Sequence, residues 1–240
     1  MILAGLVVLI ATSLGAMAVL LLKKLDGHRY SFLLAFSGGV MAYSAVEMLT
    51  ESHHAAGDIG VLAGFMAGVV ALMISERLLP HVHMHLKKKE LTDSKKKAVL
   101  IAGSIGLHNI PEGLAIATAF ASSTPLGWFV TTSIALQDIP EGALVSAPLA
   151  AYGVNKKDSL FYGILSGLAE GIAAIAGFLF LNFFSSLVPV ALAFSAGAMV
   201  YVVFVELLPD AIDGGRERRA AISFVLGAAT AFLLASVLAV

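Results

Sequence analysis

Two stretches of the sequence decide the fold: HNIPEGLAIA, residues 108–117, and QDIPEGALVS, residues 137–146. They align without a gap, and each lies inside an apolar run that is long enough to cross a bilayer. Each copy places a glutamate, Glu112 or Glu141, directly after a proline within that run. An ionised carboxylate at mid-bilayer costs about 2.5 to 3.5 kcal/mol on insertion scales. Two copies of the same costly pattern therefore indicate a functional site rather than two structural kinks.

The apolar runs continue over the whole chain of 240 residues, of which 59% are hydrophobic and 13% charged. The runs are about 20 residues long and do not alternate, which is typical of membrane-spanning helices and not of barrel strands. We therefore predict an all-α integral membrane protein with a single membrane domain over residues 1–240. The net charge of −1 gives no reason to expect a nucleic-acid partner. The eight predicted transmembrane helices begin near Ile2, Phe32, Ile59, Ala98, Leu126, Ser159, Val188 and Arg219.

The basic residues predict the orientation, because all 15 Lys and Arg lie in odd-numbered loops. Loops rich in Lys and Arg stay in the cytoplasm, so both termini are expected outside, in a multi-pass protein of the cell (inner) membrane. The third loop, residues 80–97, is rich in His and Lys, and its lysines suit contact with anionic membrane lipid. His81, His83 and His85 alternate within it, a pattern that fits either a solvated loop or a transient metal site.

A second internal repeat links spans that are far apart in the chain. FSGGVMAYSAVEML, residues 36–49, resembles FSAGAMVYVVFVELL, residues 194–208. These segments fall in the second and seventh predicted spans, and an odd separation gives the two copies opposite orientations in the membrane. With the two spans that carry the IPEG motif at the centre, we predict a 3+2+3 inverted-repeat arrangement of the eight helices.

Helical spacing gathers further polar residues around the two glutamates, because residues three and four positions apart share one helix face. No Lys or Arg is expected at that depth, so a bound cation or protons must supply the missing positive charge. The chain has no Cys, and a mixed nitrogen and oxygen donor set suits zinc, with iron, manganese, cobalt and cadmium left open. The candidate metal ligands are His108, Asn109 and Glu112 in the first copy, and Gln137, Asp138 and Glu141 in the second.

HNIPEG followed by QDIPEG, within eight helices that have a basic, His-bearing third loop, resembles the ZIP family of divalent metal transporters. The short loops resemble the prokaryotic members, and the resemblance covers essentially the whole chain. It implies a mid-membrane metal site made by the six residues above, joined by Glu170 in SGLAEG and by Met41 in SGGVM. It also implies transport of zinc or a related cation toward the cytoplasm, without enzymatic activity or a prosthetic group. Many relatives carry His where this chain has Gln137, so the site is poor in imidazole.

Several alternatives stay open from the sequence. Four carboxylates with one imidazole could hold two adjacent divalent ions, with Glu112 and Glu141 bridging them. Buried carboxylates also relay protons, so a proton-coupled carrier of an organic solute is the main rival function, and a passive metal channel is another. A di-metal membrane enzyme is disfavoured, because His108 precedes its glutamate by four residues and no GxSxG motif is present. A homodimer is also left open.

Overall fold

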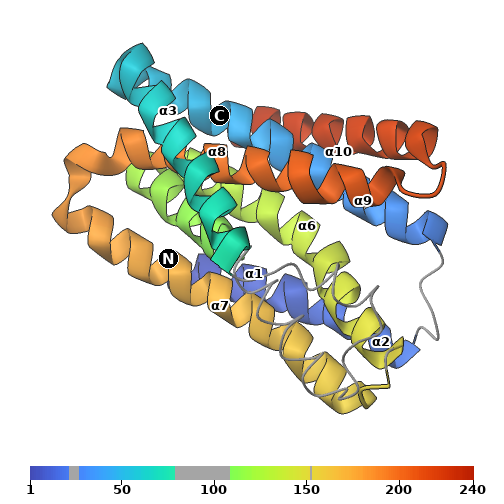
Figure 1. Cartoon of the computed structure of the whole chain (residues 1–240). Coiled ribbons are helices and arrows are strands. Elements are labelled where there is room, and N and C mark those ends of the chain that lie inside the picture. Colours follow the sequence, from blue (N-terminus) through green and yellow to red (C-terminus); the bar gives the residue numbers. More distant parts are fainter. Residues whose placement is uncertain (22–26, 79–108, 152) are drawn as a thin grey trace.

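The computed structural model describes residues 1–21, 27–78, 109–151 and 153–240. Every regular element in this part of the chain is a helix, which confirms the predicted all-α fold (Figure 1). The elements are α1 (Ile2–Ala16), α2 (Ala18–Leu21), α3 (Gly27–Leu78), a helical segment over 109–122, α6 (Thr124–Ala151), α7 (Lys156–Phe183), η1 (Ser185–Leu187), α8 (Val188–Val202), η2 (Val203–Leu207), α9 (Leu208–Ile212) and α10 (Glu217–Leu238).

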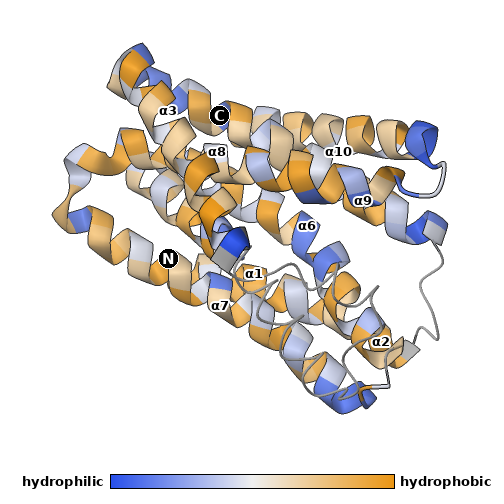
Figure 2. Ribbon diagram, in the orientation of Figure 1, coloured by the Kyte–Doolittle hydropathy of each residue, from blue (hydrophilic) through white to orange (hydrophobic). Residues whose placement is uncertain are grey.

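Five helical stretches among the described residues are long and apolar enough to cross a membrane. Hydrophobic residues cover the length of these helices, and hydrophilic ones gather near helix ends such as the starts of α7 and α10 (Figure 2). The chain is therefore a multi-pass membrane protein, whereas the eight-span, 3+2+3 arrangement and the single domain over 1–240 stay predictions. The five stretches are Ile2–Leu20, Gly27–Ser75, Lys156–Phe183, Ser185–Ile212 and Glu217–Leu238.

Helix α3 consists of two arms that meet at Gly57. Its 52 residues would extend for about 78 Å as one straight helix, far more than a bilayer core requires. Gly57 has φ 64° and ψ 176°, a conformation that only glycine adopts easily, and the chain turns back there (Figure 1). The turn lies just before residue 59, where the sequence predicts that the third span begins.

The helices form two packed sets that meet along α6. Helix α1 packs against α6 and α7, while α3 packs against α8 and α10 and also contacts α6. Glycines permit the closest crossings, because small residues let the backbones of membrane helices approach. A Cβ atom on Gly39 of α3 would overlap the carbonyl oxygen of Phe224 in α10, and one on Gly227 would overlap that of Phe36. The two helices therefore interlock through a reciprocal pair of glycines.

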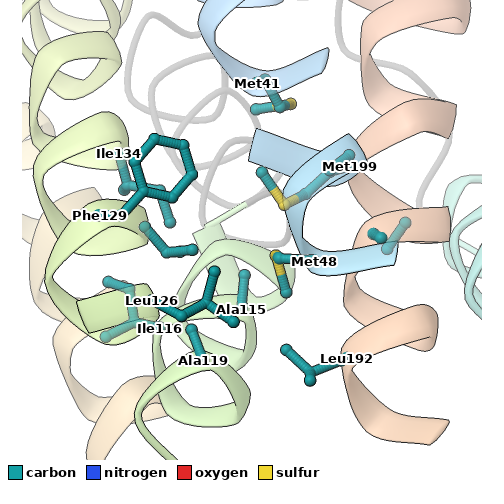
Figure 3. Packing of buried hydrophobic residues seen from close by; sticks show 14 of the residues in the cluster. Met41, Met48, Ala115, Ile116, Ala119, Leu126, Phe129, Ile134, Leu192 and Met199 are labelled. Carbon is teal, nitrogen blue, oxygen red and sulfur yellow. The ribbon is translucent and has the colours of Figure 1, made fainter. Parts of the chain in front are cut away.

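The buried apolar core lies between α3, α6 and α8, as Figure 3 shows. Met41 and Met48 of α3 and Met199 of α8 lie on one side of it, and Phe129 and Ile134 of α6 lie on the other. Met41 and Met199 occupy corresponding positions in the two repeated segments. This core joins α6 to the helices α3 and α8.

The two repeated segments, 36–49 and 194–208, differ by one irregularity. Residues 194–208 contain one residue more than 36–49, and the register is lost after the tyrosine at position 43 or 201. In the same place α8 passes into the π-helical turn η2, before α9 resumes the α-helix. A π-helical turn holds one extra residue within a continuous helix, so the insertion is absorbed without a break.

Candidate metal centre

Three carboxylates meet between the helical segment 109–122 and α6. Glu112 comes from the former, Asp138 and Glu141 come from the latter, and one ligand oxygen from each lies within 4.8 Å of the others. The Glu112 and Asp138 side chains are buried, and Glu141 is partly exposed. Asp138 and Glu141 lie in the middle of α6, where Figure 2 shows a hydrophilic stretch. The two copies of the IPEG motif therefore contribute to one cluster.

A fourth carboxylate, Glu170 of α7, lies beside this cluster. Its side chain is fully buried and interacts electrostatically with Asp138 most strongly, then with Glu112 and Glu141. Three helices that are separate in the sequence thus converge on one acidic volume inside the bundle.

Several buried carboxylate oxygens of this volume lack hydrogen-bond partners. No hydrogen bond of good geometry is made by Oε2 of Glu112 or by either carboxylate oxygen of Asp138 and Glu170. Leaving a buried polar group unsatisfied costs about 1 to 3 kcal/mol, and more when the group is charged. None of the described Lys and Arg side chains is buried, so no buried protein cation of the described ranges offsets this charge. The chemistry of the cluster therefore calls for a cation or for protons.

Two amide side chains extend the donor set. Asn109 is fully buried at the start of the segment 109–122, and Gln137 is buried one helical turn before Glu141. The nitrogen and oxygen atoms of both amides have no hydrogen-bond partner. Neutral amide oxygens can bind a metal beside carboxylates, so the described donors are all oxygen or amide groups.

The glycines that follow the two glutamates bring neighbouring helices close to the cluster. A Cβ atom on Gly113 would overlap the carbonyl oxygen of Glu170 in α7. One on Gly142 would overlap the carbonyl oxygen of Thr12 in α1. The IPEG motif therefore supplies a carboxylate of the cluster and, in the next residue, a close helix contact beside it.

Pro140 removes one hydrogen bond from α6 without ending it. The proline has no N–H to donate to the carbonyl oxygen of Leu136, which in a regular helix would accept a bond from residue 140. Helix α6 nevertheless runs from Thr124 to Ala151 with this proline inside. The consequence is a local loss of backbone pairing next to Asp138 and Glu141.

The remaining predicted ligands have different outcomes. Met41 is buried in the apolar core with Met48 and Met199, and its role as a ligand stays a prediction (Figure 3). His108 lies outside the described residues, as do His81, His83 and His85 of the third loop.

One residue near the cluster was missed by the sequence analysis. Thr12 of α1 is fully buried, and it lies within reach of the Asp138 carboxylate. The signal in the sequence is weak, because a Thr followed by Ser13 in an apolar first span looks like an ordinary membrane helix.

The fold and the cluster define a multi-pass helical membrane protein with a group of carboxylates gathered inside its helix bundle. The family model described as "ZIP Zinc transporter" matches residues 84–238. The chain is 36% identical to "Zinc transporter GufA" of Myxococcus xanthus over 95% of this chain and 93% of that protein. It is 35% identical to "Zinc transporter ZupT" of Akkermansia muciniphila, over 91% and 90% of the two chains. The chain belongs to the ZIP family, as the motif resemblance predicts.

These relatives bear the names of transport proteins, which confirms the prediction that the chain is not an enzyme. A third relative, "Zinc transporter ZupT" of Chlorobium chlorochromatii, is 34% identical over 87% of this chain and 86% of its own length.

Proposed function

We propose that this protein transports zinc, or a related divalent cation, across the cell membrane toward the cytoplasm through the carboxylate cluster between the segment 109–122 and α6. The names of its relatives support zinc as the cargo. The observation that carries the proposal is the meeting of Glu112, Asp138 and Glu141 within 4.8 Å inside an apolar bundle.

The donor set suits a borderline divalent ion. Zinc binds carboxylate oxygens at about 2.0 to 2.2 Å, so two oxygens on one ion lie roughly 3 to 4 Å apart. The separation in the cluster, up to 4.8 Å, is close to that value and needs only small side-chain shifts. Oxygen donors also suit manganese, iron, cobalt and cadmium, and these ions belong to the same proposal.

We also propose that the cluster holds a second ion next to the first. Two-metal sites hold their ions about 3.5 to 4 Å apart, with carboxylates between them. Glu112 and Glu141 would bridge the two ions. The other ligands of the two ions would be Asp138, Glu170 and the amides of Asn109 and Gln137. Met41 and His108 are proposed as further ligands on the grounds of the motif alone.

The proposed direction of transport rests on the family resemblance, because orientation in the membrane does not set the direction of flux. Basic loops in the cytoplasm put both termini outside, with lipid of the cell membrane around the exposed apolar faces. Release to the cytoplasm requires binding strong enough to dehydrate the ion and weak enough to let it leave.

Zinc uptake into proteoliposomes that contain a metal-sensitive dye tests the proposal. We expect saturable uptake by the wild type, and its loss in Glu112→Gln and in Glu141→Gln, which keep the side-chain size but remove the charge. Glu217→Gln, at the exposed start of α10, is the matched control and should transport like the wild type.

The contrary result is absence of metal flux from well-folded protein, with or without a pH gradient. Proton movement coupled to an organic solute would then favour the rival function, in which the carboxylates relay protons. Metal flux that survives both glutamate substitutions would place the metal path elsewhere in the chain.

A further inference from the structure

The inference concerns Thr12, a residue of α1 at the junction of three helices. Its side chain is 0% exposed, although α1 contributes none of the carboxylates. A Cβ atom on Gly167 of α7 would lie 2.6 Å from the Thr12 hydroxyl oxygen, and one on Gly142 of α6 would overlap the Thr12 carbonyl oxygen. Thr12 is therefore held between α6 and α7, the two helices that carry Asp138 and Glu170.

The hydroxyl of Thr12 has a single proton, and that proton is used within α1. Oγ1 donates to the carbonyl oxygen of Val8 at 2.8 Å. That carbonyl is also the regular acceptor of the Thr12 backbone N–H in the α-helical ladder. The bond from the hydroxyl is thus a second one, and Val8 stays paired when the hydroxyl turns away.

Asp138 is the alternative acceptor. Its carboxylate lies within reach of Thr12, and neither of its oxygens accepts a hydrogen bond of good geometry. Glu112, Glu141 and Glu170, which also lie near Asp138, are themselves carboxylates. The hydroxyl of Thr12 is a donor, and a small shift of the Thr12 or the Asp138 side chain brings it into hydrogen-bond geometry with that carboxylate.

We propose that Thr12 is a positioning residue of the metal centre, whose hydroxyl turns from Val8 to Asp138 when the carboxylate binds a cation and fixes the orientation of that ligand. The inference rests on the proposed function. A hydrogen bond to a charged carboxylate is roughly twice as strong as one to a neutral carbonyl, so the turn is favourable when Asp138 serves as a carboxylate ligand of the cation. Ligating carboxylates are commonly oriented in this way, and removing such a partner typically costs 10- to 100-fold in metal affinity or activity.

Two substitutions separate the hydroxyl from the rest of the side chain. Thr12→Val keeps the shape and removes the donor, whereas Thr12→Ser keeps the donor and removes a methyl group. We expect Thr12→Val to raise both the zinc Kd, measured by calorimetry on purified protein, and the KM of uptake by about 10- to 100-fold. Thr12→Ser should stay near the wild-type values.

Thr131 of α6 provides a matched control. It is fully buried, and its hydroxyl donates to the carbonyl oxygen of Gly127 at 2.7 Å, four residues before it, as Thr12 does to Val8. It lies about two helical turns before Asp138. Thr131→Val should therefore bind and transport zinc like the wild type.

The outcomes are distinct from those of the proposed function. Wild-type zinc uptake that is lost in Glu141→Gln supports the proposed function whatever Thr12 does. Unchanged zinc affinity in Thr12→Val would then overturn the role of Thr12, as would an equal loss in Thr131→Val or a failure of Thr12→Ser to retain affinity. If Thr12→Val does not fold, Thr12→Ala takes its place with the same expectations.

Discussion

At the scale of single residues, the cluster gathers charge that the surrounding bundle does not offset. Glu112, Asp138 and Glu170 are buried with carboxylate oxygens that lack hydrogen bonds. Hydration is lost in such a place, so each carboxylate needs a proton or a metal ion as its partner. This requirement makes the cluster the candidate cation site of a fold that is otherwise assembled from apolar helices.

Gln137 tests the selectivity of the donor set. Replacing this buried amide by His would add an imidazole one turn before Glu141, and imidazole suits zinc while carboxylate and carbonyl oxygens suit manganese. We expect Gln137→His to raise the preference for zinc over manganese by about tenfold, equivalent to about 1.4 kcal/mol. Competition binding of the two ions to purified protein measures it, and an unchanged ratio would remove Gln137 from the proposed ligands.

Much of this chemistry could be predicted from the sequence, because the two IPEG motifs mark Glu112 and Glu141 by position and spacing. Asp138 follows from its place on the same helix face. Thr12 could not be predicted, since no spacing within one helix tells which residue of another helix it meets. For Met41, the family resemblance predicts a metal ligand, whereas the structure shows the side chain within an apolar core.

At the scale of helices, close glycine crossings set the position of the cluster. Gly113 and Gly142 bring α7 and α1 against the two motif-bearing helices. Their role follows from the sequence, since both directly follow a motif glutamate. Gly15 of α1, which packs closely against α6, could not be predicted as a crossing point, because the first span contains several small residues that could equally well lie there. The π-helical turn was also missed, although the extra residue in 194–208 was present in the alignment of the repeats.

Gly15 and Gly5 of α1 provide a matched pair. A Cβ atom on Gly15 would overlap the carbonyl oxygen of Ile139 in α6, whereas one on Gly5 would meet Gly171 at 3.5 Å, an ordinary contact. We expect Gly15→Ala to destabilise the fold by about 1 to 3 kcal/mol, because overpacking forces the helices apart. Gly5→Ala should leave stability unchanged. Thermal unfolding in detergent compares the two, and equal melting temperatures would contradict the packing described for α1.

In the whole molecule, only one of the two helix sets surrounds the acidic cluster. Helix α1 packs with α6 and α7 around the acidic cluster. Helix α3 packs with α8 and α10 in the second set and also contacts α6. The composition and the apolar runs predict the membrane-spanning helical class, because burial of backbone in lipid allows little else. The assignment of helices to sets depends on three-dimensional contacts, which hydropathy does not encode.

The absence of Cys from the sequence makes orientation testable with single introduced cysteines. The turn of α3 and the connection between α9 and α10 lie at opposite ends of the bundle (Figure 1). His54 comes just before that turn and Asp213 belongs to that connection, and both residues are exposed. We expect a membrane-impermeant maleimide to label His54→Cys in intact cells and Asp213→Cys only after permeabilisation, since basic loops stay inside. The reverse pattern would overturn the predicted orientation.

We propose that the carboxylates of Glu112, Asp138 and Glu141 hold the transported ion. Diffraction at the zinc absorption edge, from crystals grown with zinc, locates the ion directly. We predict an anomalous peak at about 2.0 to 2.2 Å from carboxylate oxygens of at least two of these residues. A well-occupied zinc elsewhere in the bundle, with none among these three carboxylates, would contradict the claim.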